Sequence, residues 1–191
     1  MKTIVMTIML LFATGCTLHQ KSTLSKVEIT QKVDSLMDEV EKFALKAEFD
    51  ALKHGRKLTN VEISYAKSLG IKHPEKVRVQ FTKDFPIPQN KEVLKGFKEL
   101  GYDSIFLAGV TYGHGVFIKP SWLPNWLYNK DAILAHELVH VRQVEEAKNY
   151  KSFMRKYLIQ AFTHEYFEIP YEKEAYQETE KFKGFDLEGK K

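Results

Sequence analysis

The segment ILAHELVHVRQ, residues 133–143, places two histidines and a glutamate within an otherwise apolar run. Residues four apart lie on one face of a helix, so His136 and His140 can direct both imidazoles at a single point. Imidazole nitrogens are common zinc ligands, and this spacing supplies two of them. Glu137 lies one step around the helix from His136, where it would act as a general base toward water activated by the metal.

The apolar surroundings of the motif favour a functional site over a chance match. A buried helix that carries two histidines and a glutamate without a metal would desolvate these polar groups with nothing to compensate. The apolar neighbours in the run are Leu134, Leu138, Val139 and Val141. A catalytic zinc takes three protein ligands and keeps one open position, so a third ligand is expected elsewhere in the chain.

The downstream segment EIPYEKEAYQETE, residues 168–180, can supply that ligand. Together with the HExxH motif it resembles the gluzincin metallopeptidases, over about residues 105–180. In the HtpX and prenyl-endopeptidase branch, a later helix carries Glu-x-x-Ala-Asp, which residues 172–176 match except that Tyr176 replaces the aspartate. In thermolysin the later motif is Glu-x-x-x-Asp, which residues 174–178 match with a glutamate in the last position.

The two alignments imply different third ligands, Glu172 or Glu174. Residues two apart on a helix point about 200° apart, so only one of the two can face the metal. Glu172 is favoured because Ala175 then lies one turn on, as a small residue where two helices approach closely, and Glu174 remains the alternative. The resemblance implies one zinc ion per chain, a zincin-like fold and hydrolysis of peptide bonds.

The resemblance also implies how a substrate would be held. In gluzincins an edge strand before the HExxH helix pairs with the extended peptide, and GVFIKP, residues 115–120, is the candidate here. A further donor usually stabilises the oxyanion. Tyr112, His114, His164 and Tyr166 are the candidates for that role, and the sequence does not select one of them.

Composition favours one globular domain. The chain has 191 residues, of which 43% are apolar and 28% are charged, enough to form a core. The net charge of +4 is spread over 29 basic and 25 acidic residues. Because this excess is small and dispersed, we expect no nucleic-acid partner.

The first residues, MKTIVMTIMLLFATGC, have the pattern of a signal peptide: an early lysine, a short apolar run and then small residues. The run is too short to span a bilayer permanently. Its end resembles a bacterial lipobox, with Ala13 where leucine is commoner, and this implies cleavage before Cys16 and acylation of that cysteine. Cys16 is the only cysteine, so it has no partner for an internal disulfide.

A lipoprotein signal over residues 1–15 would anchor the chain to a membrane through lipidated Cys16. An ordinary signal peptide with an incidental cysteine is the alternative. Thr17, rather than aspartate, follows the cysteine. By resemblance to Gram-negative lipoproteins this implies the cell envelope and, in such a cell, the outer membrane facing the periplasm.

The rest of the chain divides into a polar tether, residues 16–27, and a single domain, residues 28–191. Thr59 and Glu62 form a capping-box pattern at the start of a helix. Apolar periodicity, capping residues and turn residues predict helices over about 28–55, 59–69, 91–100, 129–148, 150–162 and 171–182, and strands over 77–81, 104–112 and 115–120. This order predicts an α+β fold, mainly helical, with a small mixed or antiparallel sheet packed against the HExxH helix.

The motifs therefore favour a zinc-dependent metallopeptidase that acts on proteins or peptides of the cell envelope, with Glu137 as general base. The alternative is a non-catalytic zinc-binding lipoprotein that serves as a binding or assembly module. Purely structural zinc sites usually fill all four positions with protein ligands, often cysteines, and have no need of a glutamate at position 137.

Overall fold

The computed structural model describes residues 24–99, 107–120 and 129–185. The predicted signal segment, the lipidation site at Cys16 and most of the predicted tether lie outside these residues. The elements in chain order are α2 (Lys26–His54), β1 (Arg56–Lys57), α3 (Asn60–Ser68), η1 (Pro74–Lys76), β2 (Arg78–Phe81), α4 (Lys91–Glu99), β3 (Gly109–Tyr112), β4 (Gly115–Ile118), α5 (Lys130–Glu146), α6 (Tyr150–Thr163), η2 (Tyr166–Glu168) and α7 (Pro170–Glu180). The predicted α+β class, mainly helical with a small mixed sheet, is confirmed.

The four strands form one sheet in the order β1-β2-β4-β3. β1 and β2 are antiparallel, β2 and β4 are parallel, and β3 and β4 are antiparallel. The expectation that residues 115–120 form the edge strand is therefore wrong, because β4 is paired on both sides and β3 lies at the edge. A parallel pair requires a crossover connection, and the one between β2 and β4 contains α4 and β3. Local alternation of residues does not reveal such a crossover.

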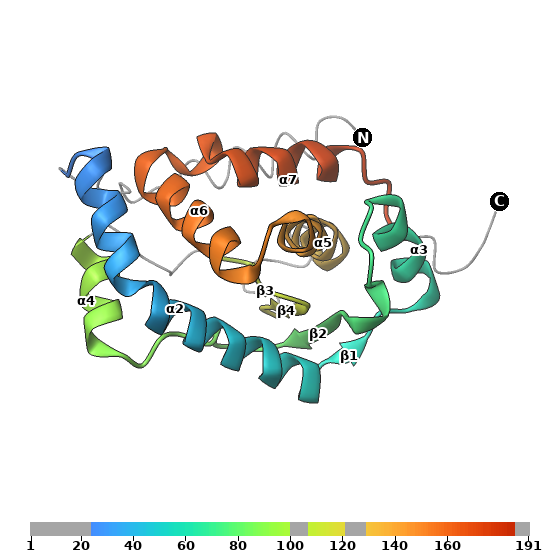
Figure 1. Cartoon of the computed structure of the whole chain (residues 1–191). Coiled ribbons are helices and arrows are strands. Elements are labelled where there is room, and N and C mark those ends of the chain that lie inside the picture. Colours follow the sequence, from blue (N-terminus) through green and yellow to red (C-terminus); the bar gives the residue numbers. More distant parts are fainter. Residues whose placement is uncertain (1–23, 100–106, 121–128, 186–191) are drawn as a thin grey trace.

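Successive residues of β4 point to opposite faces of the sheet and meet different helices. Phe117 packs on Ala47 and Ala51 of α2, where the small side chains let the helix approach closely. Val116 and Ile118 pack on the other side, in the cluster that contains Leu134, Leu138 and Val141 of α5. The sheet thus lies between α2 and α5 (Figure 1).

Local capping explains where α2 and α3 begin. The side chains of Ser25 and Glu28 form a capping box, so α2 starts at Lys26, two residues earlier than predicted. The predicted capping box of Thr59 and Glu62 is confirmed at the start of α3. Glu62 is 5% exposed and also accepts two hydrogen bonds of 2.7 Å from Arg56, which ties α3 to β1.

Helix α7 lies along α5, on the side away from the sheet (Figure 1). α5 begins after Asn129, whose side chain caps its first turn, and α7 begins at Pro170, a position where the missing N–H costs nothing. Ala175 of α7 is fully buried and leaves room for the close helix pair. Among the described helices, none has the length and apolar character needed to cross a membrane.

Candidate metal centre

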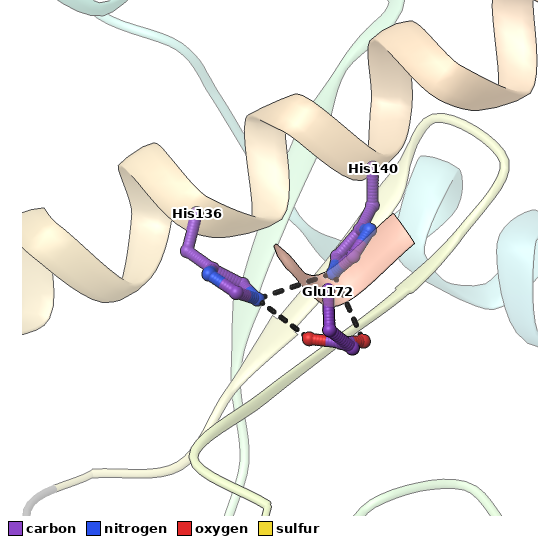
Figure 2. Close-up of side chains that lie close together, drawn as sticks. All are labelled: His136, His140 and Glu172. Atoms are coloured by element: carbon purple, nitrogen blue, oxygen red, sulfur yellow. Dashed lines mark hydrogen bonds and ion pairs between the residues drawn. The ribbon is translucent and has the colours of Figure 1, made fainter. Parts of the chain in front are cut away.

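Three side chains from α5 and α7 converge on one point (Figure 2). The Nε2 atoms of His136 and His140 lie 3.2 Å apart. The Glu172 carboxylate faces both rings, with Oε2 3.1 Å from Nε2 of His136 and Oε1 3.4 Å from Nε2 of His140. The three ligand atoms lie within 4.8 Å of one another, so this group could hold a metal ion.

The chemistry of these donors fits a metal ion. The side chains of His136, His140 and Glu172 are 13%, 10% and 3% exposed, so solvent does little to satisfy them. Two ring nitrogens that face each other need a proton or a cation between them. Two imidazole nitrogens and one carboxylate oxygen are also the protein ligands of many catalytic zinc sites.

Without a metal, His140 and Glu172 form a charged pair. Burial alone would lower the pKa of His140, but the negative charge of Glu172 outweighs burial and raises that pKa to about 9. Burial would raise the pKa of Glu172, yet the two imidazoles hold it well below its ordinary value. A metal ion would take the place of the proton on His140, since ligand imidazoles must be neutral at the coordinating nitrogen.

Glu174, the alternative third ligand, lies away from the converging rings. Its carboxylate accepts a hydrogen bond from the guanidinium of Arg142 and another, of 2.8 Å, from Nε2 of Gln143. The two glutamates leave α7 in different directions, as expected for residues two apart on a helix. The structure thus brings Glu172, and not Glu174, to His136 and His140.

Gln143 sets the orientation of His140. Its side chain is 2% exposed, and its Nε2 donates to the backbone oxygen of Tyr171 at 3.1 Å and to the carboxylate of Glu174. Because both of these partners are acceptors, the other amide atom, Oε1, must face His140, which it does at 2.8 Å from Nδ1. Nδ1 of His140 therefore carries a proton, and Nε2 is the nitrogen left for a metal.

Tyrosines surround the Glu172 carboxylate. The hydroxyl of Tyr157 donates to Oε1 at 2.6 Å, and that of Tyr166 donates to Oε2 at 3.4 Å. Burial raises the pKa of Tyr166 well above its ordinary value and that of Tyr176 to about 12, so both stay protonated at neutral pH. The ring of Tyr176, which replaces the aspartate of the resembled motif, lies 4.7 Å from that of His136.

Glu137 lies between α5 and the edge strand β3. It is 4% exposed, and its Oε2 accepts a hydrogen bond of 2.7 Å from the hydroxyl of Thr111. A side chain at Gly109 would place its Cβ 2.5 Å from Oε1 of Glu137, so glycine is required at this point of β3. Burial raises the pKa of Glu137, against the charges of His140 and His136.

The other oxyanion candidates have their contacts elsewhere. His114, in the turn between β3 and β4, hydrogen bonds Glu145 at 2.9 Å through Nε2 and lies 3.5 Å from Glu48 through Nδ1. His164 is exposed at the end of α6, where its Nδ1 lies 3.0 Å from the hydroxyl of Thr163 and 3.0 Å from the backbone oxygen of Gln160. The hydroxyl of Tyr112 donates to the backbone oxygen of Pro86 at 3.4 Å. Tyr166 is the candidate that lies against the ligand group.

Three residues that contact Glu137 or the ligand group had no site role assigned from the sequence: Thr111, Gln143 and Tyr157. Gln143 follows His140 by three residues, and this helical spacing is a signal that it shares a face with the second histidine. Tyr157 belongs to an aromatic stripe that is typical of core packing, and Thr111 is one of many strand threonines. The sequence around these last two contains no signal that Thr111 contacts Glu137 or that Tyr157 contacts Glu172.

Comparisons of the chain with family models, with curated proteins and with solved structures found no match. The resemblance to gluzincins therefore stays a prediction, and the candidate centre rests on its geometry.

Proposed function

We propose that the chain is a zinc metallopeptidase with a zincin-like fold that hydrolyses peptide bonds of cell-envelope proteins or peptides. One zinc ion per chain would be held by His136, His140 and Glu172. The observation that carries this proposal is the convergence of three ligand atoms, two from α5 and one from α7. Beside His136 on α5, the carboxylate of Glu137 lies against the edge strand β3.

Zinc fits the donor set better than the harder cations. Calcium and magnesium take mainly oxygen ligands, whereas two imidazoles and one carboxylate are typical of catalytic zinc with an open position. Bound zinc would polarise the substrate carbonyl and acidify water. Hydrogen bonds orient two of the ligands toward the ion: Gln143 orients His140, and Tyr157 orients Glu172.

Glu137 acts as general base and later as general acid. Its Oε2 is held by Thr111, so Oε1 is the oxygen that takes a proton from the attacking water. Gly109 leaves Oε1 uncovered, because any side chain there would collide with it. The same carboxyl then returns the proton to the leaving amine as the peptide bond breaks.

The substrate backbone adds to β3, the edge strand of the described sheet, and so crosses the centre in extended form. Tyr166 donates to the oxyanion, because its protonated hydroxyl already lies beside Glu172. Lipidation of Cys16 keeps the enzyme in the cell envelope, at the outer membrane if the cell is Gram-negative.

The test uses the chain from residue 17 to 191, purified with zinc and assayed on a library of quenched fluorescent peptides. Wild type should bind one zinc and cleave a subset of the library. Glu137→Gln should keep the zinc and lose at least about a thousandfold in kcat/KM, the range seen when an essential catalytic group is removed. Glu146→Gln, an exposed site on the same helix, is the matched control and should remain active.

Zinc binding without hydrolysis in wild type would favour the non-catalytic binding module instead. If purified wild type binds no zinc, both zinc proposals fail. Equal hydrolysis by wild type and Glu137→Gln would contradict the assigned general base.

A further inference from the structure

The outward face of α2 has two different halves. Over residues 42–53 it consists of six exposed side chains, three basic and three apolar: Lys42, Leu45, Lys46, Phe49, Leu52 and Lys53. The apolar ones protrude strongly, with Phe49 67% exposed, Leu45 47% and Leu52 40%. Exposed apolar side chains on successive turns of one helix are uncommon on a soluble surface unless they meet something.

These six residues share one side of the helix. At 100° per residue they fall within an arc of about 120°, and no acidic residue falls in that arc over this stretch. The buried residues Ala44, Ala47 and Ala51 lie on the opposite side, against the sheet. The arc therefore faces away from the core, and packing within the domain does not explain its apolar side chains.

The first half of the same face has the opposite character. It carries Asp34 and Asp38, which pair with Arg155 and Lys151 of α6. By contrast, none of the ion pairs found among the described residues involves Lys42, Lys46 or Lys53. Charge is thus segregated along α2, and its second half presents unpaired positive charge beside apolar side chains.

We propose that this second half of α2, defined by the six residues above, docks the domain on an anionic phospholipid surface. Lysines next to leucine and phenylalanine on one face are typical of helices that lie in a membrane interface. The apolar side chains enter the acyl boundary while each lysine meets lipid phosphates. A fluid lipid surface conforms to exposed side chains on a helix without needing a complementary groove.

This docking would orient the candidate metal centre. α2 covers one face of the sheet and α5 the other, so the centre between α5 and α7 lies on the side away from α2 (Figure 1). A domain held by α2 therefore presents the centre to the aqueous phase rather than to the lipid. The docking surface depends neither on the metal nor on acylation of Cys16, and it is tested separately from both.

The test measures co-sedimentation of the chain from residue 17 to 191, which retains all described residues, with vesicles of phosphatidylcholine alone or with phosphatidylglycerol. Wild type should bind the anionic vesicles and leave the neutral ones. The variant Lys42→Gln/Lys46→Gln/Lys53→Gln should bind about a hundredfold more weakly at low salt. The variant Leu45→Ser/Phe49→Ser/Leu52→Ser should lose binding by at least about tenfold.

The matched control is Lys67→Gln/Lys72→Gln/Lys76→Gln, which removes the same charge from other exposed positions and should bind like wild type. Circular dichroism verifies that each variant is folded. Equal binding by wild type and both α2 variants, or a loss in the control as large as in the α2 lysine variant, would overturn the proposal. So would binding to soluble polyglutamate without binding to anionic vesicles, because that result indicates an acidic protein partner.

Discussion

Within the described residues, α5 contributes to two histidine–carboxylate clusters, and these differ in the geometry of their donors. At the candidate metal centre, two rings and Glu172 direct their ligand atoms to one point. At the second cluster, the single ring of His114 lies between Glu145, at Nε2, and Glu48, nearer Nδ1. Here the two carboxylates meet opposite sides of one ring and do not converge.

This difference separates a metal site from a structural tie. Converging donors repel one another unless a proton or a metal cation lies among them, whereas a protonated imidazole between two carboxylates donates to both of them. Within the part of the chain that the structure describes, the group of His136, His140 and Glu172 is the one arranged to hold a metal. The His114 cluster instead joins α2 and α5 to the β3–β4 turn.

The largest expected contrast comes from removing one ring from each cluster. His140→Ala should abolish zinc binding at micromolar metal, because one of three ligands is lost. His114→Ala should bind zinc as wild type does. Competition with a chromophoric chelator measures both affinities, and similar losses in the two variants would mean that the clusters do not differ in the way described here.

A smaller effect is expected at Gln143, which holds the His140 ring. Gln143→Met keeps the size of the side chain but cannot accept the proton of Nδ1, and zinc affinity should fall about tenfold to a hundredfold. Gln177→Met, exposed on α7, is the control. Unchanged affinity in Gln143→Met would remove Gln143 from the support of the centre.

The smallest effect concerns the pH dependence of the His114 tie. Hydrogen bonding to Glu48 and Glu145 raises the pKa of His114 above 6.5, so its contribution is complete below pH 6.5 and is lost as pH rises through the folded-state pKa. Despite its burial, Glu48 has its pKa lowered below 4.5 by hydrogen bonds from His114. The pKa of Glu145 is lowered, also against burial, first by the backbone N–H of Lys72 and then by His114, so the contribution of both carboxylates is lost as pH falls below 4.5.

The tie is therefore strongest between about pH 4.5 and 6.5. His114→Gln should lower the free energy of unfolding by about 1 kcal/mol at pH 6 and by less at pH 9. Urea denaturation of the metal-free wild type and variant at both pH values measures this difference. A larger loss at pH 9 would show that the ring acts in its neutral form.

The sequence predicted the parts of this fold that local rules govern. Thr59 and Glu62 predicted the start of α3 because a capping box is contained within four residues. The prediction that β4 lies at the edge of the sheet was wrong, because β4 also pairs with β2 through a crossover that no local pattern encodes. The sequence made His114 a candidate oxyanion donor, whereas its partners in the structure are Glu48 and Glu145. These partners lie 66 and 31 residues away in sequence, so no local pattern reveals them.

At the candidate centre, helical spacing predicted that His136 and His140 lie together, but it did not decide whether Glu172 or Glu174 is the third ligand. The two glutamates leave α7 in different directions and meet different partners. Arg142 and Gln143 donate hydrogen bonds to Glu174. Tyr157 donates a hydrogen bond to Glu172, which lies beside the two imidazole rings. Such partners come from other helices, so helical periodicity alone cannot choose between the two glutamates.

The zinc content of purified wild type, Glu172→Gln and Glu174→Gln, determined by mass spectrometry of the metal after dialysis, tests the metal centre most directly. We expect about one zinc per chain in wild type and in Glu174→Gln, and almost none in Glu172→Gln. Zinc retained by Glu172→Gln, or absent from folded wild type, would contradict this expectation.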